Sequence, residues 1–223
     1  NEGVLSEKIF ITGNTVIDAL LDVMKKLNCS DNLRREMDNK FSYLNDNKRL
    51  ILVTGHRREN FGEGFEQICH ALKLISESHD DVEIVYPVHL NPNVQEPVKR
   101  ILGESNGISL IDPLDYLPFV YLMNRSHLII TDSGGVQEEA PSLGKPVLVI
   151  RDTTERPEAV DVGTVRLVGK NTSQIVSEVS NLLEDDNAYE NMSKRYNPYG
   201  DGDAAVRIVT TLMNTDIEDL FLV

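Results

Sequence analysis

Four short blocks of polar residues are the part of the sequence best able to do chemistry. Each block directly follows a short apolar run, and together they hold histidines, arginines, a serine and paired glycines. Cationic side chains attract anions, and glycines let backbone N–H groups approach a ligand closely. These residue types therefore indicate a site for a phosphorylated ligand. The blocks are residues 55–60, 87–91, 132–135 and 151–156.

The third block has the pattern of a phosphate-binding turn. Ser133, Gly134 and Gly135 stand between a predicted strand and a predicted helix, and the start of a helix favours negative charge. A tight turn that binds nothing would use the same three residues. Glu138 and Glu139 follow, where a carboxylate either accepts hydrogen bonds from a ribose or compensates the helix dipole. The residues alone do not decide between phosphate binding and a plain turn, or between ribose binding and compensation of the helix dipole.

The first block is basic in a chain of formal net charge −14. His56, Arg57 and Arg58 form a local positive cluster, which indicates an anionic ligand. Arg151 and Arg156 follow another predicted strand and are expected at the same rim, where together they suit a diphosphate better than a single phosphate. The alternative for the basic triplet is a set of salt bridges to Glu59, Glu63 or Glu66.

Other catalytic patterns are not found. His89 follows the second predicted strand, as either a turn residue or a ligand. No histidines are paired at i and i+4 with a glutamate, so no metal site is expected. Ser133 is not in a Gly-x-Ser-x-Gly context. Gly62 and Gly64 resemble the start of a dinucleotide fingerprint, but Gln67 replaces its third glycine, and NAD binding is rejected.

Composition narrows the class of protein. The negative charge argues against a partner that is a nucleic acid and against a polybasic grip on a membrane. Two cysteines cannot build a disulfide framework, no apolar run approaches 18 residues, and no signal peptide opens the chain. We therefore expect a cytoplasmic protein. The chain starts at Asn1, and removal of an upstream segment is a further expectation.

The elements that must position these blocks alternate between strand and helix. This alternation predicts repeated β-α-β units, a parallel sheet and one doubly wound α/β domain. Ligands bind such sheets at the carboxyl ends of the strands, which is where all four blocks fall. The predicted strands are 50–54, 82–86, 108–111, 128–131, 147–150 and 164–168, and the predicted helices are 15–27, the first part of 31–47, 64–78, 94–102, 116–123, 136–143 and 173–183.

The last forty residues differ from the rest. Residues 184–223 read as helical and acidic, with nine Asp or Glu against three Lys or Arg. Apolar residues within 204–213 recur on one helical face, and such a face requires a partner.

Read together, the blocks resemble the non-hydrolysing UDP-N-acetylglucosamine 2-epimerases. The resemblance implies the C-terminal half of a GT-B fold, a Rossmann-like doubly wound sheet. It divides the chain into an interdomain crossing segment with the first helix (1–30), a UDP-binding domain (31–195) and a C-terminal helix that packs on an absent N-terminal domain (196–223). The matching stretches are 11–18, 54–60, 86–92, 131–141, 151–158 and 197–202.

The resemblance implies a reaction and its partners. UDP-N-acetylglucosamine and UDP-N-acetylmannosamine are interconverted by elimination of UDP and its re-addition after protonation at C2. The reaction consumes no cofactor or metal. The resemblance also implies that the full-length enzyme is a homodimer and that its product is used in cell-surface polysaccharide biosynthesis. The family's proton-transferring carboxylates belong to the absent domain, so this chain alone is expected to bind UDP weakly and not to epimerise UDP-N-acetylglucosamine.

The resemblance also assigns site residues. His56 is the catalytic residue and acts at the diphosphate. Arg57 and His89 match a second, activating UDP-N-acetylglucosamine site. The UDP-binding positions are Ser133, Gly134 and Gly135 for phosphate, Glu139 for ribose, Phe119 for uracil through its backbone, Arg156 for UDP or sugar, and Leu114 where relatives use a polar uracil contact.

Two alternatives remain open. One is another GT-B enzyme, either a UDP-sugar glycosyltransferase or the hydrolysing epimerase that releases free N-acetylmannosamine. The other is a nucleotide-sugar-binding module without catalysis.

Overall fold

The computed structural model describes residues 3–214 and shows the predicted alternation of strands and helices. Every predicted strand is present, with bounds that differ by no more than a residue or so. All pairs in the six-stranded sheet are parallel, which confirms the predicted α/β class. The strands are β1 (Arg49–Thr54), β2 (Val82–Pro87), β3 (Ile108–Ile111), β4 (Leu128–Thr131), β5 (Val147–Val149) and β6 (Val165–Leu167).

The strand order explains where a ligand can enter. The order is β3-β2-β1-β4-β5-β6, so the chain builds outward from β1 in one direction and then returns to build outward from β4 in the other. The connections after β1 and β4 therefore diverge onto opposite faces and leave a crevice at their carboxyl ends. The first and third polar blocks follow these two strands.

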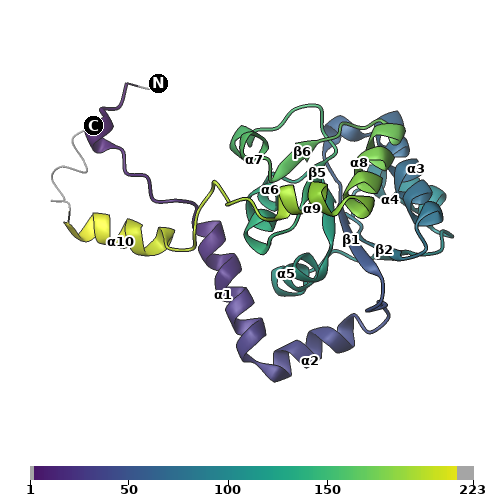
Figure 1. Cartoon of the computed structure of the whole chain (residues 1–223), viewed down its shortest axis with the longest axis horizontal. Helices are drawn as coiled ribbons and strands as arrows, with labels where there is room; N and C mark the ends of the chain where they lie inside the picture. Colours follow the sequence, from purple (N-terminus) through teal and green to yellow (C-terminus); the bar gives the residue numbers. More distant parts are fainter. Residues whose placement is uncertain (1–2, 215–223) are drawn as a thin grey trace.

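Helices cover both faces of the sheet (Figure 1). Buried side chains fall into two apolar clusters, one between the sheet and each helical layer. The first layer consists of α3 (Glu63–Ser78), α4 (Pro92–Leu102) and α8 (Thr172–Glu184), and the second includes α1 (Thr15–Cys29), α2 (Asp31–Lys40), α5 (Tyr116–Arg125) and α6 (Gly134–Glu139). A sheet buried on both faces accounts for the continuous apolar runs of its strands.

The predicted helix 136–143 is wrong in its extent. The structure has α6, which starts two residues earlier, followed by the 3-10 turn η3 (Ala140–Leu143). Pro141 stands at the start of η3 and lacks the backbone N–H that a continuing α-helix would use. Four elements had no individual prediction: the 3-10 turns η1 (Ser6–Lys8) and η2 (Arg58–Asn60), and the helices α7 (Pro157–Val162) and α9 (Asp186–Ser193).

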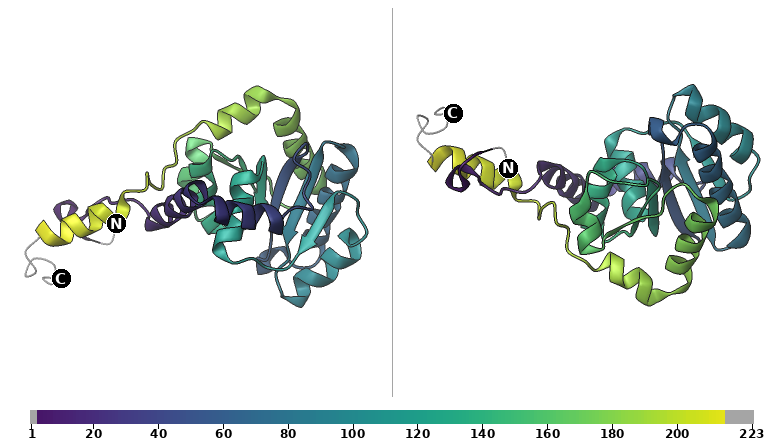
Figure 2. Two further views of the ribbon diagram at one scale, coloured as in Figure 1. Left: turned by 90° about the horizontal axis from the view of Figure 1, so that it is seen from below. Right: turned by 90° about the horizontal axis from the view of Figure 1, so that it is seen from above.

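The two ends of the described chain form an arm that projects from the α/β body (Figure 2). The N-terminal segment, with the 3-10 turn η1 (Ser6–Lys8), runs beside α10 (Ala204–Asn214). The Asp18 carboxylate of α1 accepts from the first two amides of α10, at 3.2 and 2.8 Å. Apolar side chains on the arm are exposed, with Ile11 at 94% and Met213 at 81%. Parts of the predicted end segments, residues 1–2 and 215–223, lie outside the described residues.

Within residues 3–214, no helix combines the length and the apolar character that crossing a membrane requires.

Candidate functional site

The paired carboxyl ends of β1 and β4 bring the first and third polar blocks together. The hydroxyl oxygens of Thr54 and Thr131, the last residues of the two strands, are 2.6 Å apart. The Asp132 amide donates to the Thr54 carbonyl at 3.2 Å, and the Ser133 amide donates to the Thr131 hydroxyl at 2.9 Å. The expected proximity of His56 and Ser133 at one edge of the sheet is thus confirmed, although the two are far apart in sequence.

Asp132 organises the loop that carries His56. Its carboxylate is fully buried and accepts from the backbone amides of His56 (2.9 Å) and Arg57 (2.8 Å). The same oxygen accepts from the side chain of Asn60, a buried residue of η2, at 3.2 Å. The His56 ring remains 41% exposed, with its Nδ1 3.5 Å from the other Asp132 oxygen. The sequence analysis gave Asp132 no role, although its place directly before the Ser-Gly-Gly turn is the signal that could have found it.

Two arginines converge on the start of α6. A methyl group placed at Gly134 would lie 4.0 Å from a terminal nitrogen of Arg57 and 4.0 Å from one of Arg156. At Gly134 no side chain therefore stands between the two guanidinium groups and the first amides of the helix. The helix start and both cations favour an anion there.

The alternative for the basic triplet 56–58 was a set of salt bridges to three nearby glutamates. Two of these glutamates have other partners. Glu59 pairs with Arg151 at 2.5 Å, and Glu66 pairs with Arg100 at 2.5 Å. Neither carboxylate is therefore committed to neutralising Arg57.

Arg151 does not behave as expected. Its side chain is only 5% exposed, and it binds the carboxylates of Glu59 and Glu155. The bidentate contact with Arg151 lowers the pKa of Glu155 to about 2. The expectation that Arg151 joins Arg156 at a diphosphate is therefore corrected, because two acidic partners already satisfy its buried guanidinium group.

Glu138 serves neither of the two roles considered for it. Its carboxylate accepts from Arg156 Nε and, at 2.8 Å, from the side chain of Asn14, which caps α1. Its backbone carbonyl accepts from Asn197 at 2.7 Å. Glu138 therefore links α6 to Arg156 and to both segments that lead into the projecting arm.

Glu139 is the more accessible of the two glutamates. Burial raises the pKa of its carboxyl group, and the neighbouring Glu138 raises it further, whereas the Tyr116 hydroxyl lowers it by donating a hydrogen bond at 2.7 Å. The same contact and burial raise the pKa of Tyr116. Tyr116 is thus a site neighbour that the sequence analysis did not identify.

The residues predicted for uracil lie at the start of α5. Leu114 and Phe119 are half-buried and pack against the second apolar cluster. The Phe119 amide donates to the Asp115 carbonyl at 3.1 Å, so this donor is already used inside the helix.

His89 lies next to His56, as its predicted membership of a second ligand site requires. The two rings stack with centroids 5.3 Å apart and an interplanar angle of 15°. His89 Nδ1 also accepts from the Asn91 amide at 3.1 Å, a local turn contact. His89 is therefore both a turn residue and a neighbour of the candidate site.

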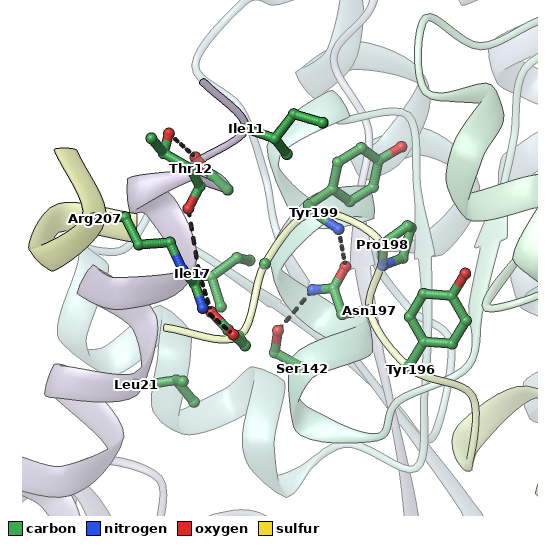
Figure 3. A pocket seen from close by; sticks show the side chains of 13 residues that line it. Ile11, Thr12, Ile17, Leu21, Ser142, Tyr196, Asn197, Pro198, Tyr199 and Arg207 are labelled. Carbon is green, nitrogen blue, oxygen red and sulfur yellow. Dashed lines mark hydrogen bonds and ion pairs between the residues drawn. The ribbon is translucent and has the colours of Figure 1, made fainter. Parts of the chain in front are cut away.

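A separate cavity of about 620 Å³ lies where the body meets the arm (Figure 3). Its wall includes Ser142, whose hydroxyl accepts from Asn197 at 2.6 Å, and Arg207, which pairs with Asp201 at 2.6 Å. No residue predicted for UDP lines this cavity. Across residues 3–214, no cluster of three or more His, Cys, Asp or Glu is arranged to hold a metal ion.

Comparisons with known proteins agree with the sequence resemblance. A family model described as UDP-N-acetylglucosamine 2-epimerase matches residues 1–213. The UDP-N-acetylglucosamine 2-epimerase of Escherichia coli K12 is 62% identical over 216 residues, which are 97% of this chain and 57% of that protein. The chain thus spans little more than half the length of the curated relatives it matches.

Solved structures show the same likeness. The Neisseria meningitidis UDP-GlcNAc 2-epimerase, crystallised with UDP-GlcNAc, superposes with a TM-score of 0.92 at 48% identity, covering 96% of this chain and 57% of that one. WaaG, a glycosyltransferase of lipopolysaccharide biosynthesis, superposes with a TM-score of 0.60 at 16% identity, covering 84% and 52%. The second likeness concerns the fold alone, and both agree with the predicted Rossmann-like half of a GT-B fold.

Proposed function

The chain belongs to the UDP-N-acetylglucosamine 2-epimerase family, and from that premise we propose that its six-stranded domain binds UDP and the UDP part of UDP-N-acetylglucosamine. The whole protein would interconvert UDP-N-acetylglucosamine and UDP-N-acetylmannosamine by eliminating and re-adding UDP. This chain would hold the nucleotide during that exchange.

One observation supports this proposal above all. Arg57 and Arg156 come from loops that follow different strands, yet both approach the start of α6 at Gly134. Two cations and several backbone amides around one glycine match a diphosphate in charge and in hydrogen-bonding capacity.

The remaining assignments follow from the positions around this point. Ser133, Gly134 and Gly135 would bind phosphate oxygens, and His56 would act at the diphosphate. Glu139 would accept from ribose hydroxyls, while Phe119 and Leu114 would border the uracil. Arg57 and His89 are also candidates for a second nucleotide-sugar molecule, because His89 stacks on His56.

The chemistry proposed for this domain is electrostatic. Breaking the anomeric C–O bond leaves negative charge on departing UDP, and donors already aimed at a diphosphate stabilise that charge. The same contacts keep UDP in place, so that its return to the sugar is effectively unimolecular. The proposed reaction consumes neither a metal nor a nicotinamide.

We extend the proposal to the arm and to the setting of the protein. The exposed apolar side chains of 4–11 and of α10 would pack on the part of the relatives' length that this chain does not cover. Residues 1–30 would then form the crossing segment and first helix that lead from an N-terminal domain into the UDP-binding domain 31–195. Residues 196–223 would return to pack on that N-terminal domain. The complete enzyme would be a homodimer in the cytoplasm, serving cell-surface polysaccharide biosynthesis, with neither a nucleic acid nor a membrane as partner.

Calorimetric titration of the chain with UDP and with uridine tests the binding proposal. We expect UDP to bind at least tenfold more tightly than uridine, because the diphosphate contributes charge-assisted hydrogen bonds. Arg57→Gln should remove about tenfold of the UDP affinity. Arg58→Gln is the matched control from the same loop and should leave it unchanged. Equal affinities for UDP and uridine would refute the proposal.

An NMR assay of UDP-N-acetylglucosamine turnover tests the catalytic part. We expect no epimerisation by this chain alone, and full epimerisation would contradict that expectation. Release of free N-acetylmannosamine together with UDP would instead favour the hydrolysing alternative. The assay is repeated after adding a polypeptide that corresponds to the part of the relatives this chain does not cover. If the chain binds UDP but the mixture is still inactive, the result would favour a binding module without catalysis.

A further inference from the structure

The two carboxylate oxygens of Asp132 have unequal surroundings. Oδ2 accepts three hydrogen bonds, from the amides of His56 and Arg57 and from the side chain of Asn60. Oδ1 has no hydrogen-bond partner within the described part of the chain, although the residue is fully buried. A buried acceptor without a donor is unfavourable, so this oxygen requires an explanation.

The His56 ring can supply the donor. Its Nδ1 lies 3.5 Å from Asp132 Oδ1, at the outer limit of a hydrogen bond. If Nδ1 carries the ring proton, a small rotation of the ring brings the N–H group into a bond with Oδ1. If Nδ1 is unprotonated, a nitrogen lone pair faces a carboxylate oxygen, and the two repel each other.

The stacking of His89 on His56 limits the other movements of this ring. His89 Nδ1 accepts from the Asn91 amide, so the neutral form of His89 carries its proton on Nε2. Stacking restricts the tilt of the His56 ring, but a half-turn about the Cβ–Cγ bond leaves the ring plane unchanged and is still allowed. Asp132 distinguishes the two orientations that a half-turn would exchange, because its oxygen attracts an N–H group and not a C–H group.

We propose that Asp132 is a positioning residue that holds a proton on His56 Nδ1 and fixes the ring orientation, leaving Nε2 for the ligand. The ligand rests on the proposed function, as the diphosphate of UDP. When Nε2 also carries a proton, it can donate to a phosphate oxygen while Nδ1–H remains bound to the carboxylate. A carboxylate that orients a histidine in this way stabilises the ring without touching the ligand.

The test reads the two ring nitrogens of His56 by ¹⁵N NMR. The chain is labelled at histidine and measured without ligand, at a pH where the ring is neutral, and His56→Gln identifies the His56 signals. We expect the proton on Nδ1 in the wild type and on Nε2 in Asp132→Asn. The asparagine oxygen can still accept from the loop, while its NH₂ group now faces the ring as a donor.

Asn60→Ala is the matched control. It removes one donor to Oδ2 and perturbs the same loop, but it leaves Oδ1 beside His56, so the proton should stay on Nδ1. A wild-type proton on Nε2 would overturn the proposal whether or not the variants fold. An unchanged tautomer in Asp132→Asn, or an equal change in Asn60→Ala, would also overturn it.

A titration with UDP separates this proposal from the proposed function. Asp132→Asn should weaken UDP binding about tenfold, with a smaller effect on uridine. Equal losses for UDP and uridine would indicate a general loosening of the site and would count against positioning. If wild-type UDP binding fails while the tautomer results hold, the proposed ligand is wrong and the positioning role of Asp132 stands.

Discussion

Arg49 at the amino edge of the sheet and Arg57 at its carboxyl edge have opposite surroundings. At the amino edge, Arg49 binds Asp81 and the Leu183 carbonyl, each at 2.5 Å. His127 stacks on Tyr189 at 4.2 Å, and the Tyr189 hydroxyl donates to the His127 carbonyl at 3.0 Å, but the buried Nε2 of the His127 ring has no hydrogen-bond partner in the described chain.

At the carboxyl edge, the partners of His56 and Arg57 are incomplete. His56 stacks on His89, yet its ring is 41% exposed, and Arg57 Nε is buried with no hydrogen-bond partner in the described chain. Satisfied polar groups stabilise a fold, whereas cationic groups without full partners are available to a ligand. The difference indicates which edge works as a site, and it can be tested by changing one edge at a time.

The largest effect is expected from a pair of arginine substitutions. Arg156→Gln should weaken UDP binding by about 2 kcal/mol, or roughly 30-fold, because a charge-assisted contact to phosphate is lost. Arg49→Gln should leave UDP affinity unchanged and lower the free energy of unfolding by about 1–2 kcal/mol.

Calorimetry with UDP and urea denaturation check the two halves of this prediction. Arg156→Gln will also lose some stability, because Glu138 is left buried with a weaker partner. The comparison fails if Arg49→Gln weakens UDP binding as much as Arg156→Gln does.

Glu139→Gln, at the carboxyl edge, should change UDP affinity and stability in opposite directions. The raised pKa of Glu139 means that the folded state binds its proton more readily than the unfolded state. Stability is therefore lost as the pH rises from the ordinary value of 4.5 through the raised folded value, and glutamine removes that loss.

We expect Glu139→Gln to raise the thermal midpoint at pH 7 while weakening UDP binding about fivefold, as one ribose contact becomes neutral. Calorimetric scans at pH 4 and pH 7 show the sign, because the gain should shrink at the lower pH. A variant that is less stable at pH 7 would contradict the predicted direction.

Ser133→Ala should have a smaller effect. One hydrogen bond from a neutral hydroxyl donor to phosphate would be lost, while the backbone amides at the start of α6 remain. We expect about threefold weaker UDP binding and an unchanged thermal midpoint. Calorimetry and thermal melts check this, and a loss as large as that of Arg156→Gln would mean that the hydroxyl contributes more than the cations.

The smallest effect concerns pH at the amino edge. Burial, with nearby Arg49, lowers the pKa of His127, so the folded state releases its proton more readily than the unfolded state. Stability should therefore fall as the pH decreases through the ordinary value of 6.5. His127→Phe retains a ring beside Tyr189 and cannot take up a proton, so its melting temperature should decrease less between pH 8 and pH 5.5.

UDP affinity of His127→Phe should equal that of the wild type, because the change lies at the opposite edge from the proposed site. An identical pH dependence of the melting temperature in the variant and the wild type would show that protonation of His127 does not affect stability.

Much of the site could be predicted from the sequence because its parts are local. Apolar runs predicted the strands, and residues that follow neighbouring parallel strands must meet at one edge, as His56 and Ser133 do. Asp132 was missed because its importance depends on contacts with residues 56–60 that no spacing in the sequence reveals. Arg151 was misjudged for the same reason, since its partners come from two different loops.

The sequence alone determined the alternation of strands and helices, the edge at which the polar blocks collect, and the family. These depend on local periodicity and on the order of residues along the chain. The tertiary structure decided how each charge is paired: Arg151, Arg49 and Arg156 lie against nearby acids, whereas Arg57, beside Gly134, has a buried Nε without a hydrogen-bond partner in the described chain. The physical reason is that an ion pair depends on a few ångströms between long side chains from distant segments, and only the packed fold sets those distances.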